Sequence, residues 1–132
     1  MLTISTQSDY GLLMISYLLK KKEYVPVSEL VEKMNLPQRY LARIAAEMAK
    51  HKILVSREGK VGGYKLTEKA KTMNLYDFLR IFEGEVSIAR CDKPGFTCKW
   101  YDVCQHKGVL RNTFSKILSR ELKKQKLLTL FH

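Results

Sequence analysis

The chain has 132 residues, of which 45% are hydrophobic, enough apolar material for one globular domain with a modest core. It contains no apolar run of about 18 residues, and its first residues lack the basic flank and apolar stretch of a signal peptide. These features exclude a membrane span and favour a cytoplasmic protein. The formal net charge of +11 predicts a polyanionic partner such as nucleic acid, although a basic surface that only faces solvent has the same composition.

Residues 7–21 show the periodicity of a helix. The apolar residues on its expected inner face are Leu12, Ile15, Leu18 and Leu19. Either Ser8 or Thr6 is expected to cap this helix, because both side chains can accept a hydrogen bond from a free amide. Asp9 suits the first turn, where a carboxylate meets the positive end of the helix dipole.

The next segments predict a helix-turn-helix. Residues 25–27 are expected to be extended, Ser28 to cap a helix that ends at Asn35, and Pro37 to open a third helix that runs to Lys50. The expected inner face of this third helix consists of Leu41, Ile44, Ala45 and Met48. Its expected outer face carries Gln38, Arg39, Tyr40, Arg43 and Lys50. Those near the start of the helix, Gln38, Arg39, Tyr40 and Arg43, suit the base edges and phosphates of a DNA major groove, and Ser28 and Pro37 are expected to belong to the same DNA-binding surface. The alternative is a helical hairpin with an ordinary polar face.

A hairpin is predicted directly after that helix. Residues 53–58 and 64–66 form strands in this prediction, and residues 59–63 form a turn with three glycines. A hairpin in this position is typical of a wing. Gly62 and Gly63 would let the backbone approach a duplex closely, and Arg57, Lys60 and Lys65 would reach phosphates or a narrow minor groove. The glycines do not match a phosphate-binding nucleotide loop.

Two short helices are expected to follow the hairpin. Thr67 caps residues 68–70, and Asn74 caps residues 75–83, which Gly84 ends. The second of these helices is expected to pack under the wing.

All three cysteines of the chain, Cys91, Cys98 and Cys104, lie in one polar segment that also contains Pro94 and Gly95. Structural cysteines are usually scattered through a core, and an odd number argues against a closed disulfide framework. Clustered thiols on a loop therefore resemble ligands, and thiolates select zinc, copper(I) or iron–sulfur clusters.

A long amphipathic helix is predicted to begin at Val109 or Leu110. Its apolar stripe consists of Leu110, Phe114, Ile117, Leu118 and Leu122, opposite a basic face. A stripe outside the winged core has to be buried, and the same helix of a second chain is the expected partner. Residues 127–131 are expected to add to that contact or to fray.

Taken together, these elements resemble the Rrf-type winged-helix transcription regulators. The resemblance rests on Met1-Leu-Thr-Ile-Ser with Ser8-Asp9-Tyr10-Gly11, on residues 25–30 followed by Tyr40-Leu41, on the wing over residues 59–66, and on Leu75-Tyr76-Asp77-Phe78-Leu79 with Phe82-Glu83-Gly84. The wing is the most specific match. The cysteine loop is similar to that of the members that bind iron–sulfur clusters.

The resemblance implies a mainly α fold with a small β-hairpin wing and a long C-terminal dimerisation helix. The expected domains are a winged helix-turn-helix over residues 1–84, a cluster-binding loop over 85–106 and a dimerisation helix over 107–132. It implies a homodimer that binds a double-stranded DNA operator as a repressor and is not an enzyme. The expected signal is cluster status, iron, redox state or nitric oxide.

The implied cofactor is a 2Fe–2S or 4Fe–4S cluster on Cys91, Cys98 and Cys104. Its fourth ligand is expected to be Asp9 from the second subunit, with His106 as the alternative. Three other interpretations stay open. They are a structural zinc site built from the cysteines and His106, a metal-free thiol redox switch, and a small redox carrier, which would leave the wing unexplained.

Overall fold

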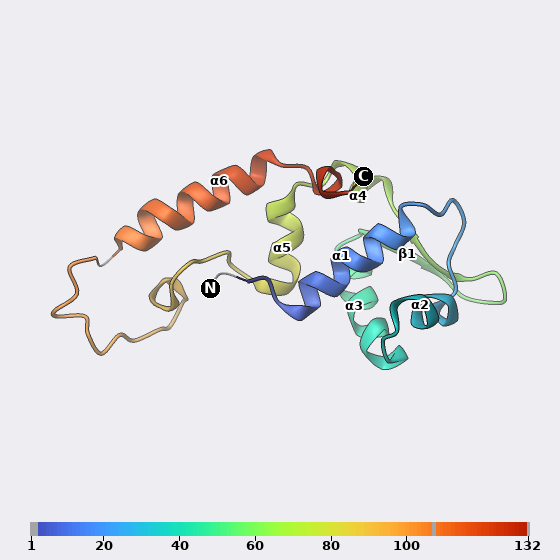
Figure 1. Ribbon diagram of the computed structural model, residues 1–132, viewed down its shortest axis with the longest axis horizontal. Helices are drawn as coiled ribbons and strands as arrows, with labels where there is room; N and C mark the ends of the chain where they lie inside the picture. The colour runs from blue at the N-terminus through green and yellow to red at the C-terminus, as the bar shows by residue number, and fades with distance from the viewer. Residues whose placement is uncertain (1–2, 107, 132) are drawn as a thin grey trace.

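The computed structural model describes residues 3–106 and 108–131. The helices are α1 (Thr6–Leu18), α2 (Val27–Met34), α3 (Gln38–Lys50), α4 (Glu68–Thr72), α5 (Leu75–Glu83) and α6 (Lys116–Lys124), and the two strands are β1 (Leu54–Arg57) and β2 (Gly63–Leu66). Short 3-10 helices lie at Arg90–Asp92 (η1) and Leu127–Leu130 (η3), and a π-helix at Leu110–Ser115 (η2) leads into α6 (Figure 1). This arrangement confirms the predicted class, mainly helical with one antiparallel hairpin.

Three predictions lie outside the described part of the chain. They concern the first two residues of the N-terminal motif, Met1 and Leu2, the domain boundary at residue 107, and the side chain of Leu110 on the apolar stripe.

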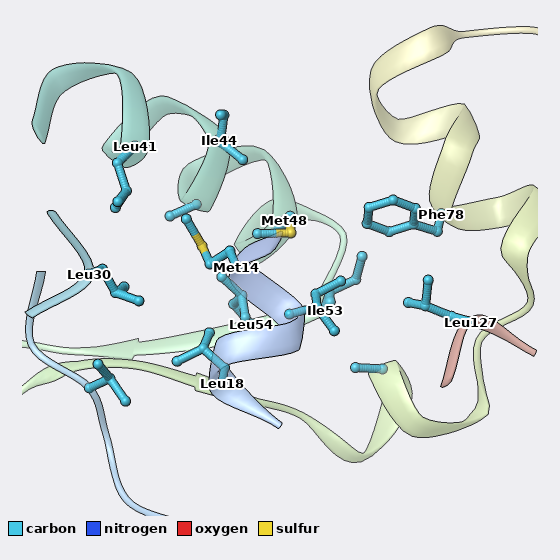
Figure 2. Packing of buried hydrophobic residues seen from close by; sticks show 14 of the residues in the cluster. Met14, Leu18, Leu30, Leu41, Ile44, Met48, Ile53, Leu54, Phe78 and Leu127 are labelled. Atoms are coloured by element: carbon cyan, nitrogen blue, oxygen red, sulfur yellow. The ribbon is translucent and has the colours of Figure 1, made fainter. Parts of the chain in front are cut away.

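One core joins the three N-terminal helices to the hairpin, α5 and η3. Figure 2 shows Met14 of α1, Leu30 of α2, Ile44 of α3, Phe78 of α5 and Leu127 of η3 converging on it. All four residues predicted for the inner face of α3 are buried: Leu41, Ile44, Ala45 and Met48. Burial of each large apolar side chain contributes roughly 1.5–3 kcal/mol to folding.

The cap of α1 differs from the prediction. Ser5, rather than Ser8 or Thr6, is the N-cap, and its hydroxyl accepts a hydrogen bond from the Ser8 amide at 3.2 Å. Ser8 itself is fully buried. Asp9 does lie in the first turn, as predicted.

The inner face of α1 is also rotated from the expected one. Ile15 and Leu18 are buried as predicted, but Leu12 and Leu19 are only half-buried. The buried face of α1 includes Gly11, which lies against α5. A Cβ at Gly11 would approach the Phe82 ring to 2.9 Å, so the absence of a side chain brings the two helices together.

The turn between α2 and α3 has the predicted left-handed residue, since Asn35 has φ of 51°. The residues that precede α2 and α3 differ from the predicted caps. Pro26 precedes α2 and offers no side-chain cap, so Ser28 lies within the helix instead of capping it. Pro37 immediately precedes α3 and sets its direction through its fixed φ.

In the hairpin, Leu54 pairs with Leu66 and Arg57 with Gly63. The connector before α2 pairs with β2 through an isolated antiparallel bridge, because Val25 and Tyr64 exchange two backbone hydrogen bonds of 2.9 Å. The wing is therefore attached to the helix-turn-helix through backbone as well as side chains.

Thr67 and Asn74 cap α4 and α5 as predicted. The expected packing of α5 under the wing is wrong, because α5 packs between α1 and α6 (Figure 1). Its two phenylalanines, Phe78 and Phe82, lie against α1 instead.

The long C-terminal helix begins as expected near Val109, although its first turns are π-helical. After α6 the chain returns to the core. The Leu75 amide donates to the Gln125 carbonyl at 2.8 Å, the Leu127 amide donates to the Met73 carbonyl at 2.9 Å, and Leu127 is fully buried. The expectation that this segment frays or joins a dimer contact is thus wrong for Leu127. Every helix over residues 3–106 and 108–131 is too short or too polar to cross a bilayer.

Candidate nucleic-acid interface and cysteine pocket

The outer face of α3 presents three polar side chains at the start of the helix. Gln38, Arg39 and Arg43 are all exposed. Leu41 and Ile44, on the opposite face, are buried in the core and fix the helix rotation that keeps these side chains outward. The arrangement can place amide and guanidinium donors in a major groove.

Tyr40 is placed differently from the prediction. It is half-buried and packs edge-on against Tyr10 of α1, with ring centroids 5.6 Å apart. The sequence periodicity assigned it to the outer face, but its ring also covers the junction between α1 and α3. Tyr40 therefore helps to orient α3 in addition to any contact that its hydroxyl makes.

The cationic side chains of the wing differ in how closely other residues hold them. Lys60, in the turn, is exposed. The Arg57 guanidinium lies 4.1 Å from the ring centroid of Tyr24 and donates a hydrogen bond to the Val61 carbonyl at 3.0 Å. The Lys65 ammonium is 5.9 Å from the same ring. No local pattern predicts this use of Tyr24, because more than thirty residues separate its ring from the wing.

The wing glycines are required by the chain's own backbone. A Cβ at Gly62 would lie 2.1 Å from the Arg57 carbonyl oxygen, and one at Gly63 would lie 1.9 Å from the Val25 carbonyl oxygen. Gly63 also has φ of +136°. Gly62 therefore allows a close approach within the hairpin itself, and Gly63 allows one between the wing and the connector before α2.

The three cysteines and His106 line a single pocket of about 520 Å³. Cys91 is exposed, whereas Cys98 and Cys104 are half-buried. The remaining walls are largely apolar or aromatic and include Phe96, Trp100, Tyr101 and Val103. Three thiols thus face one apolar cavity although twelve residues separate the first from the last.

Within this pocket, the Cys104 sulfur lies 3.4 Å from Nδ1 of His106. Among the described residues, no three Cys, His, Asp or Glu side chains are gathered as ligands of one metal ion. The pocket therefore offers a soft donor set without the compact geometry of a structural zinc site. Asp9 is exposed on α1 and is not part of this pocket wall.

The loop that carries the cysteines is anchored to the long helix by a buried hydrogen bond. The Ser115 hydroxyl donates to the Asp92 carboxylate at 2.8 Å, and the Ile88 amide donates to the Ser115 oxygen at 3.4 Å. Both Asp92 and Ser115 are buried. Asp92 adjoins Cys91, and Ser115 is the last residue of the π-helix, so this contact links the pocket wall to the start of α6.

A second polar cluster joins α1 to the end of α5, directly before the cysteine loop. Glu83 accepts hydrogen bonds from the Ser5 amide at 2.7 Å and the Ser8 hydroxyl at 2.5 Å. Burial by itself raises the pKa of Glu83, but the hydrogen bonds from Ser8 and Ser5 outweigh it and leave that pKa below its ordinary value of 4.5. The partners are more than seventy residues apart, so the sequence pattern could not identify them.

Figure 1 shows the two candidate sites at opposite ends of the long axis. The wing projects at one end and the cysteine loop at the other, with α1 and α5 between them. Any effect of the pocket on the wing of the same chain must therefore pass through the helices or through a second subunit.

Comparison with known proteins agrees with this architecture. The family model Rrf2, described as an iron-dependent transcriptional regulator, matches residues 4–132. The HTH-type transcriptional regulator NsrR of Oceanobacillus iheyensis is 26% identical over 123 residues, which are 89% of this chain and 84% of that protein. NsrR of Shouchella clausii is 21% identical over 118 residues, or 87% and 79% of the two chains.

Two solved structures show the same fold. CymR, the global cysteine regulator of B. subtilis, has a TM-score of 0.73 and 24% identity, with 98% of this chain and 96% of that chain covered. IscR of T. potens has a TM-score of 0.69 and 21% identity, with 98% and 85% covered. Because the family model spans nearly the whole chain, this protein belongs to the Rrf2 family of DNA-binding transcription regulators, and not to a family of enzymes.

Proposed function

We propose that this regulator is a homodimeric repressor that senses iron–sulfur cluster status, iron, redox state or nitric oxide. The observation that carries the proposal is that Cys91, Cys98, Cys104 and His106 line one pocket at the end of the molecule remote from the wing. Thiolate donors around an apolar cavity suit an iron–sulfur cluster better than a single hard cation.

Cys91, Cys98 and Cys104 would hold the cluster, which when bound supplies iron and sulfide that react with oxidants and nitric oxide. The chain's own contribution is to shape the pocket. Asp92 and Ser115 fix the loop next to Cys91, and the side chains of Phe96, Trp100 and Tyr101 supply apolar wall around the thiols.

Two residues remain candidates for the fourth ligand. His106 lines the pocket and contacts the Cys104 sulfur. Asp9 would have to come from the second subunit, because within one chain it lies on α1 outside the pocket wall. Asp9→Ala and His106→Ala, compared for their cluster spectra, distinguish the two.

The homodimer is supported by the part of the apolar stripe that the chain leaves uncovered. Phe114 and Ile117 are 50% and 45% exposed, whereas Leu118 and Leu122 are half-buried on the side of α5. A second copy of the helix would cover the two exposed side chains. It would also place two recognition helices for operator half-sites about one DNA turn apart.

The proposed DNA contacts are those of α3 and the wing. Gln38, Arg39 and Arg43 read base edges or phosphates, Tyr40 adds its hydroxyl, and Arg57, Lys60 and Lys65 reach the backbone or minor groove. Ser28, Pro37, Gly62 and Gly63 lie next to these contacts and shape the surface.

The first experiment is anaerobic purification followed by a visible spectrum and iron and sulfide analysis. A brown protein with matched iron and sulfide, whose colour is lost in Cys98→Ala but kept in the matched loop variant Thr97→Ala, supports the cluster. A colourless protein after reconstitution, or a Cys98→Ala variant with an unchanged spectrum, contradicts it.

The second experiment selects a duplex from a random-sequence library and measures its affinity for variants. Arg43→Ala should weaken binding to that duplex by ~1–3 kcal/mol. Arg80→Ala, which removes an exposed arginine from α5, is the matched control and should bind like the wild type. Equal affinities for Arg43→Ala and the wild type would refute the recognition-helix contact.

A metal-free thiol switch is the second candidate function. It is favoured by two separate observations: the Cys104 sulfur lies 3.4 Å from Nδ1 of His106, and Cys91 is exposed, which leaves its thiol accessible to oxidants. Colourless protein whose duplex affinity changes on treatment with peroxide and recovers with dithiothreitol would favour this function over the cluster.

A further inference from the structure

Tyr24, in the connector between α1 and α2, faces the wing. Its ring centroid lies 4.1 Å from the Arg57 guanidinium carbon and 5.9 Å from the Lys65 ammonium nitrogen. The ring is half-buried, and Arg57 is exposed. One aromatic side chain from the helix-turn-helix thus contacts cations from both strands of the wing.

The backbone around Tyr24 is fixed independently of its ring. Val25, the next residue, is buried and exchanges two hydrogen bonds of 2.9 Å with Tyr64 of β2. Gly63 packs so closely on the Val25 carbonyl that no side chain fits between them. Removing the Tyr24 ring should therefore leave the wing attached while releasing the two cations.

Arg57 keeps most of its hydrogen-bonding capacity while it is stacked. A guanidinium has five N–H donors in one plane, and the structure uses one of its nitrogens for the Val61 carbonyl, at 3.0 Å. The contact with the Tyr24 ring uses none of these N–H groups as a hydrogen-bond donor to the ring's hydroxyl, so the remaining donors are available to other acceptors. A phosphate or a minor-groove base edge can bind these donors without breaking the contact with the ring.

We propose that Tyr24 is a positioning residue for DNA binding, which holds Arg57, and to a lesser extent Lys65, in the orientation that contacts the duplex. The inference rests on the proposed wing contact. A long cationic side chain loses rotamer freedom when it binds, and an aromatic face that restricts it beforehand reduces this loss. Tyr24 acts through Arg57 and needs no contact with DNA of its own.

The test measures binding of a fluorescein-labelled duplex, chosen by selection from a random library, to the 132-residue chain. Tyr24→Leu should bind about two- to tenfold more weakly, the range expected for losing a cation–π contact. Tyr24→Phe keeps the ring and should bind like the wild type. Tyr24→Trp, whose ring attracts cations more strongly, should bind at least as tightly as the wild type. If Tyr24→Leu fails to fold, the affinity of Tyr24→Trp for the duplex tests the inference instead.

A double-mutant cycle separates positioning from a general structural role. Arg57→Gln alone should weaken binding and lower the salt slope by about one. In the Arg57→Gln background, Tyr24→Leu should have little further effect, because its target is gone. An equal penalty in both backgrounds, wild-type binding by Tyr24→Leu, or binding by Tyr24→Phe as weak as by Tyr24→Leu would overturn the inference.

Tyr76 provides a matched control within the chain. It is also half-buried and also lies near two cations, Arg80 at 5.8 Å and Lys123 at 4.7 Å, but on α5 away from the wing. Tyr76→Leu should leave affinity for the duplex unchanged, and a loss equal to that of Tyr24→Leu would contradict the inference. If Arg57→Gln has no effect, the proposed wing contact fails with the inference; if only Tyr24→Leu has none, the inference alone fails.

Discussion

The head of the molecule, which is the part formed by residues 3–84, and its cysteine loop are stabilised in different ways. The head supplies fourteen of the fifteen buried apolar residues of one core, and Leu127, from the far end of the chain, is the fifteenth. In the loop over residues 85–106, Asp92 is the one buried residue, and Trp100 and Val103 are 61% and 72% exposed. A region with a core keeps its conformation unaided, whereas a region without one depends on its anchors and on what it binds.

The largest expected effect concerns the residue that joins the C-terminus to the head. Leu127→Ala should lower the unfolding free energy by about 2–5 kcal/mol, because it leaves a cavity in the core. Leu130→Ala, three residues later and 45% exposed, should change it by less than about 0.5 kcal/mol. Urea unfolding of both variants measures the difference, and equal values would mean that η3 does not belong to the core.

The next effect concerns the attachment of the wing to the head. Gly63→Ala should cost about 2 kcal/mol or more, because its Cβ would collide with the Val25 carbonyl and its backbone conformation is unfavourable for alanine. Gly59→Ala, where no atom lies within 4 Å, should cost about 1 kcal/mol from its positive φ alone. The comparison is made by thermal unfolding. A larger loss for Gly59→Ala would show that the Val25 contact does not control the wing.

A smaller effect is expected where the head meets the loop. Glu83→Ala should cost about 1–2 kcal/mol, because it leaves the buried Ser8 hydroxyl and the Ser5 amide without an acceptor. Glu85→Ala, at an exposed position two residues later, is the control.

The loss of unfolding free energy caused by Glu83→Ala is predicted to depend on pH. The pKa of Glu83 is lower in the folded chain than its ordinary value of 4.5, so the ionised carboxylate stabilises the fold. Its contribution is fully present above pH 4.5 and is lost as the pH falls through the lower, folded value. The difference in unfolding free energy between wild type and Glu83→Ala should therefore shrink in acid, and a difference that grows would contradict the assignment.

The smallest effect on stability is expected in the loop itself. Cys98→Ala should change the unfolding free energy of the metal-free chain by less than about 0.5 kcal/mol, because Cys98 is half-buried outside the core. The same substitution should abolish the cluster spectrum. A loss of several kcal/mol in the metal-free chain would mean that the loop is part of the head's stability.

The head could be predicted from the sequence to a large extent because its signals are local. The spacing of Leu41, Ile44 and Met48 defined the inner face of α3, and Asn35 and Asn74 marked a turn and a cap. The errors arose where distant segments meet. Ser5 replaces Ser8 as a cap beside Glu83, and α5 packs on α1 because Gly11 has no side chain.

In the candidate sites, too, the features with local sequence signals could be predicted, and the contacts between distant residues could not. The three cysteines could be grouped because they are close in sequence, and the structure places them around one pocket. The Asp92–Ser115 hydrogen bond and the stack of Arg57 on Tyr24 carry no local pattern, since each pairs residues more than twenty positions apart.

The burial of Leu127 has a consequence for the synthesis of the protein. Translation delivers the helix-turn-helix and the wing first, but their core lacks a residue until position 127 has left the ribosome. A chain that stops early, within the cysteine loop, therefore has a DNA-reading surface on an incomplete core. Such fragments should be removed by proteolysis faster than the whole chain.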